Sequence, residues 1–375
     1  MAKIISVTQS CVPGGVYRTA LIHTAFLRKK KHNSLYYSII GQPNKYWSLF
    51  DEYGIRPLYT SCFRSESCTR IMGDIVFSKH FVEDVKSSDL IIAHNNPGAR
   101  VALEFKKKYN IPFVFYLHDS LVYPIFGSIY NILFNFKKLA RRYEDKFLQY
   151  SDLVIVNSQI TLKKIFHNHY LTTNTINDKI KILYPTLNIP LEKKEIVQDK
   201  QEYLLIVGRI DHEAFYYLYN IIKRLNFPLI IAGYGHPHNN NFKKILRLYK
   251  NLTNHQKVKF IFSPSDDELL SLYKNACLFV YPGHENFNMS ALEAMSAGCP
   301  ILVADTSGIL DIVSNDLRDK IALPKNDIHL WVERINRIIQ SKEYIDLGNE
   351  CWKATANYNL NTHLKCFEDL INKFI

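Results

Sequence analysis

Two glutamates, Glu285 and Glu293, lie eight positions apart in the segment 282–300, which reads P-G-H-E-N-F-N-M-S-A-L-E-A-M-S-A-G-C-P. The run 277–282 just before them is short and apolar, as is typical of a buried parallel strand. The loop that follows should lie at the carboxyl end of a strand and the amino end of a helix, where open α/β sheets bind ligands and backbone N–H groups attract anions. Two carboxylates placed there could hold the hydroxyl groups of a polyol at two separate points.

A helix is predicted over 290–297, with Asn288 or Ser290 as its N-cap. Glu293 lies among small and apolar residues of this helix, and a carboxylate that packs against a sheet needs partners. The alternative interpretation is structural. Glu293 is then a first-turn residue favoured by the helix dipole, and Glu285 is a solvated loop charge.

The segment resembles the signature of the retaining glycosyltransferases of family four, which have the GT-B fold. In that signature a Glu, seven residues and a second Glu are followed by A-M-x-x-G-x-P, and the match here is Glu285, Glu293 and the run 294–300. The resemblance implies that the first Glu contacts the donor sugar and the second contacts the ribose of the nucleotide. It extends donor binding to the residues between them: Asn286, Phe287, Asn288, Met289 and Ser290.

Short apolar segments alternate with longer amphipathic ones along the chain, a pattern that predicts parallel sheets wound with helices on both faces. The expected strands are 4–8, 89–93, 112–117, 152–156, 203–207, 228–232, 258–262, 277–281 and 300–304. The charged, Pro-containing stretch 188–201 is the expected break between two domains. We therefore expect an α/β protein with two Rossmann-like domains. The resemblance implies the GT-B arrangement, in which the two domains face across a cleft.

The resemblance assigns a role to each part of this architecture. Residues 1–190 are the expected acceptor-binding domain, and residues 191–357 are the expected nucleotide-sugar-binding domain. The tail 358–375 matches the closing helix of the family, which crosses back to the first domain. The length of 375 residues suits two domains of ordinary size, and a hydrophobic content of 47% excludes a wholly disordered chain.

Four shorter motifs extend the resemblance. Gly14 and Gly15 match the N-terminal glycine turn, where the backbone can approach the donor or the acceptor. His118, in Y-L-H-D, matches a His that faces the reaction centre. Arg209, in V-G-R-I, matches an Arg that pairs with the donor diphosphate, and Gly233 fits a loop near the nucleotide. The structural alternatives are a plain turn, a structural His at a strand end and a surface Arg.

The chain departs from the family pattern at two places. The family usually has a Lys five residues after the Arg, and this chain has Ala214 there, with His212 as a weak substitute. One positive charge fewer is then available for the diphosphate. Asn286 and Asn288 stand where the family commonly carries glycines, but Asn tolerates left-handed backbone, so we expect the loop shape to survive. The two side chains would narrow the sugar pocket and alter the donor or acceptor preference.

The formal net charge is +12, with basic clusters at 28–32 and 137–142. Such a balance favours a polyanionic partner or an anionic membrane surface. Nucleic acid is a weak alternative, because the sequence has no helix-turn-helix, zinc-finger spacing or RNA-binding aromatic signature. The uncharged segment 120–136 is too short to span a membrane; it either lies in the membrane interface or forms a buried helix and a substrate loop.

The compartment follows from three sequence features. No other segment approaches transmembrane length, and the first ten residues lack the features of a signal peptide. The seven cysteines indicate neither a disulfide framework nor a zinc site. We expect a cytoplasmic protein, soluble or peripheral on the inner membrane face.

The resemblance implies an enzyme that moves a hexose from a nucleotide-sugar donor to a hydroxyl of a glycan or lipid-linked acceptor, with retention of anomeric configuration. Glu285, His118 and Arg209 are the expected catalytic residues. The leaving phosphate would help to deprotonate the acceptor, so that neither a cofactor nor a metal is required. Two alternatives remain: a non-catalytic glycan-binding or partner subunit that lost the Lys at position 214, and a GT-B sugar-nucleotide epimerase.

Overall fold

The structure is a computed structural model that describes residues 1–11, 14–40, 46–60, 77–119, 136–168, 177–187, 201–235, 239–255 and 257–375. The predicted interfacial segment 120–136 and the predicted break 188–201 lie outside these residues, apart from the last position of each. The chain divides into two compact units, the first with Met1–Pro185 and Asn361–Ile375 and the second with Thr186–Leu360. Among the helices that the structure describes, none is both long and apolar enough to cross a membrane.

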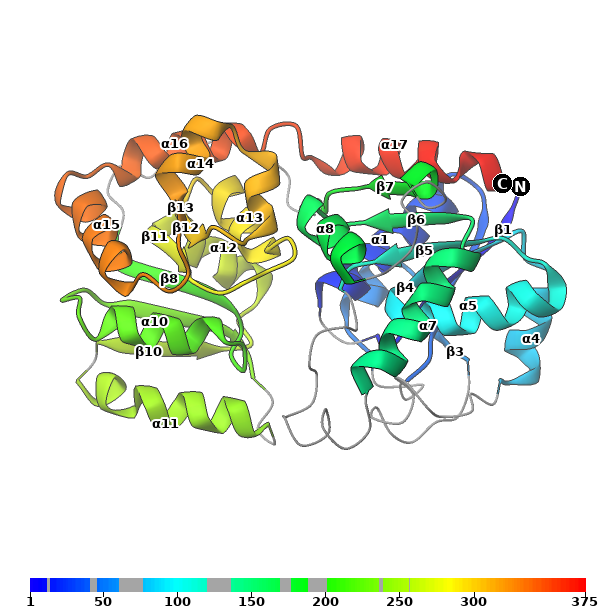
Figure 1. Cartoon of the computed structure of the whole chain (residues 1–375), viewed down its shortest axis with the longest axis horizontal. Helices are drawn as coiled ribbons and strands as arrows, with labels where there is room; N and C mark the ends of the chain where they lie inside the picture. The colour runs from blue at the N-terminus through cyan, green and yellow to red at the C-terminus, as the bar shows by residue number, and fades with distance from the viewer. Residues whose placement is uncertain are drawn as a thin grey trace. The chain divides into compact units, whose positions relative to one another are not determined.

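The first unit is built on a parallel sheet of seven strands in the order β3-β2-β1-β4-β5-β6-β7 (Figure 1). Its strands are β1 (Lys3–Thr8), β2 (Asn33–Ser38), β3 (Leu58–Tyr59), β4 (Leu90–His94), β5 (Phe113–Leu117), β6 (Leu153–Val156) and β7 (Ile180–Ile182). Its helices are α1 (Gly15–Lys29), α2 (Leu49–Glu52), α4 (Lys79–Lys86), α5 (Asn95–Tyr109), α7 (Phe136–Tyr150), α8 (Gln159–Asn168) and α17 (Leu360–Ile371).

Both faces of this sheet are buried, as parallel sheets require. Ile4 and Tyr116 belong to the core on the face covered by α1 and α17. Val7 and Phe115 belong to the core on the opposite face, which α4, α5, α7 and α8 cover. The C-terminal helix is therefore part of the first unit's core, and Phe367 is one of its fully buried residues.

The second unit has a parallel sheet of six strands in the order β10-β9-β8-β11-β12-β13. Its strands are β8 (Gln201–Arg209), β9 (Leu229–Tyr234), β10 (Val258–Phe262), β11 (Ala276–Tyr281), β12 (Ile301–Ala304) and β13 (Ala322–Leu323). Its helices are α10 (Ala214–Ile222), α11 (Asn240–Asn254), α12 (Asp266–Asn275), α13 (Met289–Ser296), α14 (Asn315–Ile321), α15 (Ile328–Gln340) and α16 (Tyr344–Ala354).

The nine expected strands are all present, as β1, β4, β5, β6, β8, β9, β10, β11 and β12. The α/β class and the two Rossmann-like sheets are confirmed. Four strands were not predicted: β2, β3, β7 and β13. Three of these lie at sheet edges and are two or three residues long, too short for a periodic pattern, whereas β2 reads N-S-L-Y-Y-S and lacks a continuous apolar run.

Candidate functional site

The two central strands of the second unit bring predicted donor residues to one edge of the sheet. β8 pairs with β11, and the chain order reverses between them, because β9 and β10 lie on one side and β12 and β13 on the other. Open α/β sheets bind ligands outside the carboxyl ends of the strands at such a switch point. Arg209 is the last residue of β8, and β11 leads into the loop that carries Glu285.

This loop has a defined backbone. Asn288 is the N-cap of α13: its φ is 75°, in the left-handed region, and its side chain accepts a hydrogen bond from the Ala291 N–H at 3.0 Å. Asn288 thus adopts the left-handed backbone that asparagine tolerates. Ser290, the other predicted N-cap, lies inside the helix, so that assignment is wrong. The Gly308 N–H donates to the Glu285 carbonyl at 3.0 Å and ties the loop to the segment after β12.

Glu285 is held by two side chains. The Tyr281 O–H donates to Glu285 Oε1 at 2.6 Å, and His212 Nε2 lies 3.7 Å from the same oxygen. Burial, and then the charge of Glu285, raises the pKa of the Tyr281 phenol well above its usual value, so the phenol remains a donor at neutral pH. The Glu285 side chain is still 34% exposed, and can therefore meet a ligand.

His212 contributes to this arrangement through its tautomer. His212 Nδ1 accepts a hydrogen bond from the Ala214 N–H at 3.3 Å, so a neutral His212 carries its proton on Nε2, the nitrogen that faces Glu285. Tyr281 Oη lies 3.2 Å from His212 Nδ1. The residue predicted as a substitute cation for the diphosphate thus contacts the loop carboxylate.

Glu293 is held in a parallel way by a second buried tyrosine. The Tyr273 O–H donates to Glu293 Oε2 at 2.9 Å, and burial, followed by the charge of Glu293, raises the pKa of this phenol well above its usual value. Helix α13 has no acidic residue in its first turn, so the interpretation of Glu293 as a first-turn residue is wrong. Each glutamate of the signature therefore has its own tyrosine donor.

Arg209 is exposed, with 70% of its side chain accessible. Its Nε donates to Asp211 Oδ1 at 2.7 Å, and Asn239 Nδ2 holds the other oxygen of Asp211 at 2.6 Å. Ala214 is fully buried at the start of α10, and a Cβ on Gly283 would lie 2.6 Å from the Ala214 Cβ. The small residue at position 214 thus packs against the signature loop.

The predicted glycines have different surroundings. Gly14 is the N-cap of α1, and Gly14 and Gly15 are exposed after β1, beside the switch point between β1 and β4. Gly233 has φ 146°, and a Cβ there would lie 1.9 Å from the Gly208 carbonyl oxygen. Close packing of β8 and β9 alone therefore requires Gly233. Phe287 as a whole is only 2% exposed, so this residue offers almost no surface to a donor.

His118 lies in the first unit, one residue after the end of β5. Its backbone N–H donates to Asn95 Oδ1 at 2.8 Å, and its carbonyl accepts from Asn157 Nδ2 at 3.1 Å. Its Nε2 lies 3.1 Å from His94 Nδ1, and its ring stacks on Tyr116 at 4.2 Å between centroids. Burial lowers the pKa of His118 well below its usual value, so its ring is neutral at pH 7.

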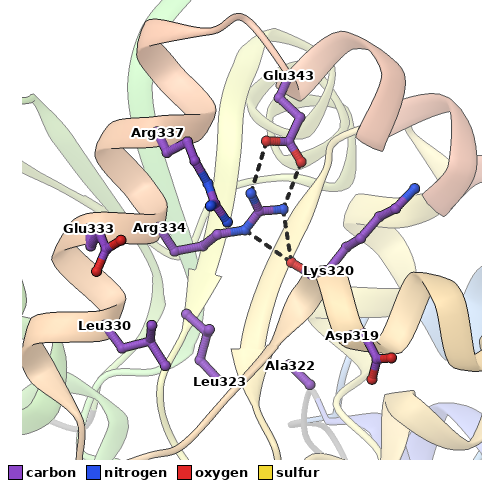
Figure 2. Close-up of a pocket in the computed structure, with 9 residues that line it drawn as sticks. All are labelled: Asp319, Lys320, Ala322, Leu323, Leu330, Glu333, Arg334, Arg337 and Glu343. Carbon is purple, nitrogen blue, oxygen red and sulfur yellow. Dashed lines mark hydrogen bonds and ion pairs between the residues drawn. The ribbon is translucent and has the colours of Figure 1, made fainter.

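A pocket elsewhere in the second unit lies between α14, β13 and α15 and is lined by charged side chains (Figure 2). Arg334 forms two hydrogen bonds with the Glu343 carboxylate, at 2.8 and 2.7 Å, and also donates to the Lys320 carbonyl. These groups satisfy one another and join α15 to the start of α16. None of the predicted site residues lines this pocket.

Sequence reasoning missed the residues behind the predicted ones: Tyr281, Tyr273 and His94. A tyrosine in a buried strand or helix needs a partner for its hydroxyl, which was the available signal. The identity of that partner depends on which strands become neighbours. Among the described residues, no group of three or more His, Cys, Asp or Glu side chains is placed to hold a metal ion.

Comparison with known proteins accounts for both halves of the chain. Residues 13–188 match the model of the Glycosyltransferase Family 4 domain, and residues 189–354 match that of the Glycosyl transferases group 1 domain. The chain is 32% identical over 194 residues to an uncharacterised glycosyltransferase of Methanocaldococcus jannaschii, covering 46% of this chain and 48% of that protein. It is 24% identical over 215 residues to the human alpha-1,3/1,6-mannosyltransferase ALG2, covering 51% and 50%.

The chain thus spans about half the length of these relatives. The solved structure of Anabaena HepE in complex with UDP and glucose superposes on the full length of both chains with a TM-score of 0.78 and 17% identity, which supports the fold. Together with the two domain models and the paired Rossmann-like sheets, this places the chain in the glycosyltransferases of the GT-B fold, of the family-four type.

Proposed function

We propose that this protein transfers a hexose from a nucleotide-sugar to an acceptor hydroxyl with retention of anomeric configuration. The observation that carries the proposal is the pair of signature glutamates, each fixed by a buried tyrosine at the switch point of the second sheet. In this proposal Glu285 binds hydroxyls of the donor sugar and Glu293 binds the ribose. Both carboxylates are positioned before the substrate arrives, as catalysis by orientation requires.

The diphosphate would be stabilised by the residues around the end of β8 and the start of α13. Arg209 offers a permanent charge and a fork of N–H groups, and the amino end of α13 offers backbone donors. As the bond between the anomeric carbon and the diphosphate oxygen breaks, negative charge grows on the leaving group, and these donors bind it more strongly than in the ground state. The leaving phosphate takes the proton of the acceptor hydroxyl. The acceptor oxygen bonds to the anomeric carbon on the face from which the diphosphate leaves. This scheme uses neither a metal nor a cofactor.

His118 would lie on the acceptor side of the reaction, since its domain is the first. Its neutral ring can exchange hydrogen bonds with a hydroxyl group without adding a positive charge near the sugar. Gly14 and Gly15 would allow the backbone after β1 to approach the substrates. Several relatives are named as mannosyltransferases, which suggests a mannose donor. The HepE complex contains UDP and glucose, which suggests a glucose donor instead.

The distribution of charge supports an anionic acceptor surface. The first unit contains 27 Lys and Arg against 15 Asp and Glu, whereas the second contains 20 of each, so the whole net charge of +12 belongs to the first unit. A positively charged domain attracts anionic lipid headgroups and lipid-linked phosphates. We therefore propose a peripheral association with the cytoplasmic face of a membrane, where a lipid-linked glycan would be the acceptor.

A panel of UDP- and GDP-hexoses tests this function. Each donor is incubated with the protein and a lipid-linked or glycan acceptor, and nucleoside diphosphate release and acceptor mass are measured. Release of the diphosphate with a matching gain of one hexose on the acceptor is expected for one donor. Conversion of the donor to its epimer would indicate a sugar-nucleotide epimerase. Donor or glycan binding with no turnover would indicate a binding subunit, and either outcome would overturn the proposal.

A further inference from the structure

Four histidines form a row inside the first unit, and the proposed function uses only His118. His363 belongs to α17, His23 to α1, His94 is the last residue of β4, and His118 follows β5. His363 Nε2 and His23 Nε2 are 2.8 Å apart, and His94 Nδ1 and His118 Nε2 are 3.1 Å apart. The two pairs meet where the rings of His23 and His94 have centroids 6.4 Å apart. The row thus runs from the C-terminal helix to His118 at the carboxyl end of β5.

All four rings are neutral at pH 7. Burial is the main cause in each case: it lowers the pKa of His94 to about 3 and that of His363 to about 4, and it lowers the pKa of His23 and His118 well below the usual value. A neutral imidazole has one N–H donor and one lone-pair acceptor. A fixed proton on one ring of a directly hydrogen-bonded pair therefore fixes the proton position of the other ring.

The carbonyl of Tyr184 sets the first proton. It lies 2.8 Å from His363 Nδ1 and can only accept, so His363 Nδ1 carries the proton and His363 Nε2 is a lone pair. His23 Nε2 must then donate to His363 Nε2, which leaves His23 Nδ1 as a buried lone pair. The His23 ring stacks on Phe367, which lies in α17 with His363, at 3.6 Å between centroids. This contact fixes the orientation of the His23 ring.

Two buried nitrogens remain at the junction of the pairs. Within the described part of the chain, neither His23 Nδ1 nor His94 Nε2 has a hydrogen-bond partner, and both residues are fully buried. An unsatisfied buried polar atom destabilises the folded protein, and buried waters typically bond to such groups. The two rings that carry these nitrogens have centroids 6.4 Å apart and are tilted by 38° to each other.

We propose that one ordered water joins these nitrogens and makes the four histidines a single hydrogen-bond chain directed from His118 to Tyr184. In this chain His94 Nε2–H donates to the water, and the water donates to His23 Nδ1. A common direction lets each bond polarise the next. His94 Nδ1 is then a lone pair, and His118 Nε2–H donates to it.

The consequence for the site rests on the proposed function. His118 Nδ1 carries no proton, so every bond that this nitrogen makes is as an acceptor. His23, His94 and His363 are positioning residues that fix the tautomer and ring orientation of His118.

Nitrogen-15 NMR of the full-length protein with labelled histidine tests the hydrogen-bond chain directly. The couplings between the ring nitrogens and the carbon-bound ring protons show which nitrogen is protonated. We expect His118 and His94 to be protonated at Nε2, His23 at Nε2 and His363 at Nδ1. A His363→Phe variant that remains folded should show both tautomers at His118, and the exposed control His329→Gln should leave the parental spectrum. His118 protonated at Nδ1 in the parent, or unchanged in His363→Phe, would overturn the proposal.

A second comparison keeps the proposal testable if His363→Phe does not fold. In His94→Asn, the amide can accept from His118 and donate to the water, whereas His94→Leu has a similar size and can do neither. We expect kcat to fall about tenfold in His94→Leu and by less than about threefold in His94→Asn. The KM for the donor should change little in either variant. Equal loss in both variants would contradict the positioning role. The NMR result does not depend on turnover, so it separates failure of the chain from failure of the proposed function.

Discussion

The hydrogen bonds of the two signature glutamates differ in where they act. The bond from Tyr281 reaches the loop carboxylate, Glu285, and the bond from Tyr273 reaches the helix carboxylate, Glu293. If the first binds the sugar and the second the ribose, loss of one phenol should disturb the reacting group and loss of the other should disturb only nucleotide binding. The two tyrosines are thus a matched pair for separating the roles of the carboxylates.

We predict that Tyr281→Phe lowers kcat by roughly tenfold, since a hydrogen bond to a charged group contributes about 1.5–3 kcal/mol. Tyr273→Phe should instead raise the KM for the donor and leave kcat within about twofold of the parent, because ribose contacts act equally in ground and transition states. Steady-state kinetics at saturating acceptor measures both. Identical effects of the two substitutions would show that the carboxylates do not have separate roles.

Arg209 is the residue at which the missing family lysine matters most. Position 214 is a fully buried alanine, which supplies no cation beside the Arg209 guanidinium. We predict that Arg209→Ala weakens nucleoside diphosphate binding by about tenfold or more and that Arg209→Lys restores part of it, since Lys keeps the charge but loses the planar fork. Calorimetric titration gives the affinities.

Asp211→Asn is the control for this substitution, because it removes the negative charge beside Arg209 without removing the cation. It should bind the nucleoside diphosphate at least as tightly as the parent does. Parental affinity in Arg209→Ala would place the diphosphate elsewhere.

At the scale of elements, the strands that could be predicted were those with a continuous apolar run. Val258–Phe262 was predicted to the residue, and the run before Glu285 was placed within one residue of β11. The two-residue strands β3 and β13 gave no such signal, because they exist only through pairing with a neighbour. The same reason explains why Glu285 and Asn288 could be found from local spacing, whereas the contacts of His118 with His94 could not: they join separate strands.

The buried histidine row predicts a dependence of stability on pH. The pKa of each of the four rings is lower in the folded protein than in the unfolded chain, so the unfolded chain binds protons first as the pH falls. The free energy of unfolding is therefore highest above about pH 6.5. Below that pH it falls by up to about 1.4 kcal/mol per pH unit for each histidine. We expect the melting temperature to fall steeply between pH 7 and pH 5.5.

His363→Gln, which removes one of these rings, should reduce that slope, and the exposed His329→Gln should not. Differential scanning fluorimetry across this pH range compares the three proteins. A melting temperature that is level from pH 7 to pH 5.5 in the parent would be inconsistent with a buried neutral row.

At the scale of the whole molecule, the charge separates by unit: the first unit carries +12 and the second is neutral. We predict that the protein sediments with liposomes that contain anionic phospholipid, is released by high salt, and does not sediment with neutral liposomes, because screening weakens attraction between exposed charges. Reversal of two exposed lysines in the first unit, Lys29→Glu with Lys31→Glu, should weaken binding.

The same change of charge in the second unit, Lys243→Glu with Lys244→Glu, is the control and should have a smaller effect. Equal weakening by the two double variants would mean that only total charge matters. Binding that ignores lipid charge would remove the electrostatic basis of the membrane proposal.

In the proposed function, the signature loop carries out retaining transfer of a sugar. Proton NMR of the reaction, followed from mixing with the donor that turns over in the panel, tests it most directly, because it reports the rate of transfer and the anomeric configuration of the first product. We predict a product with the configuration of the donor, formed by the parent and reduced at least a hundredfold in Glu285→Gln, whose melting temperature stays close to parental. A first product of inverted configuration, or transfer at the parental rate in Glu285→Gln, would contradict the account.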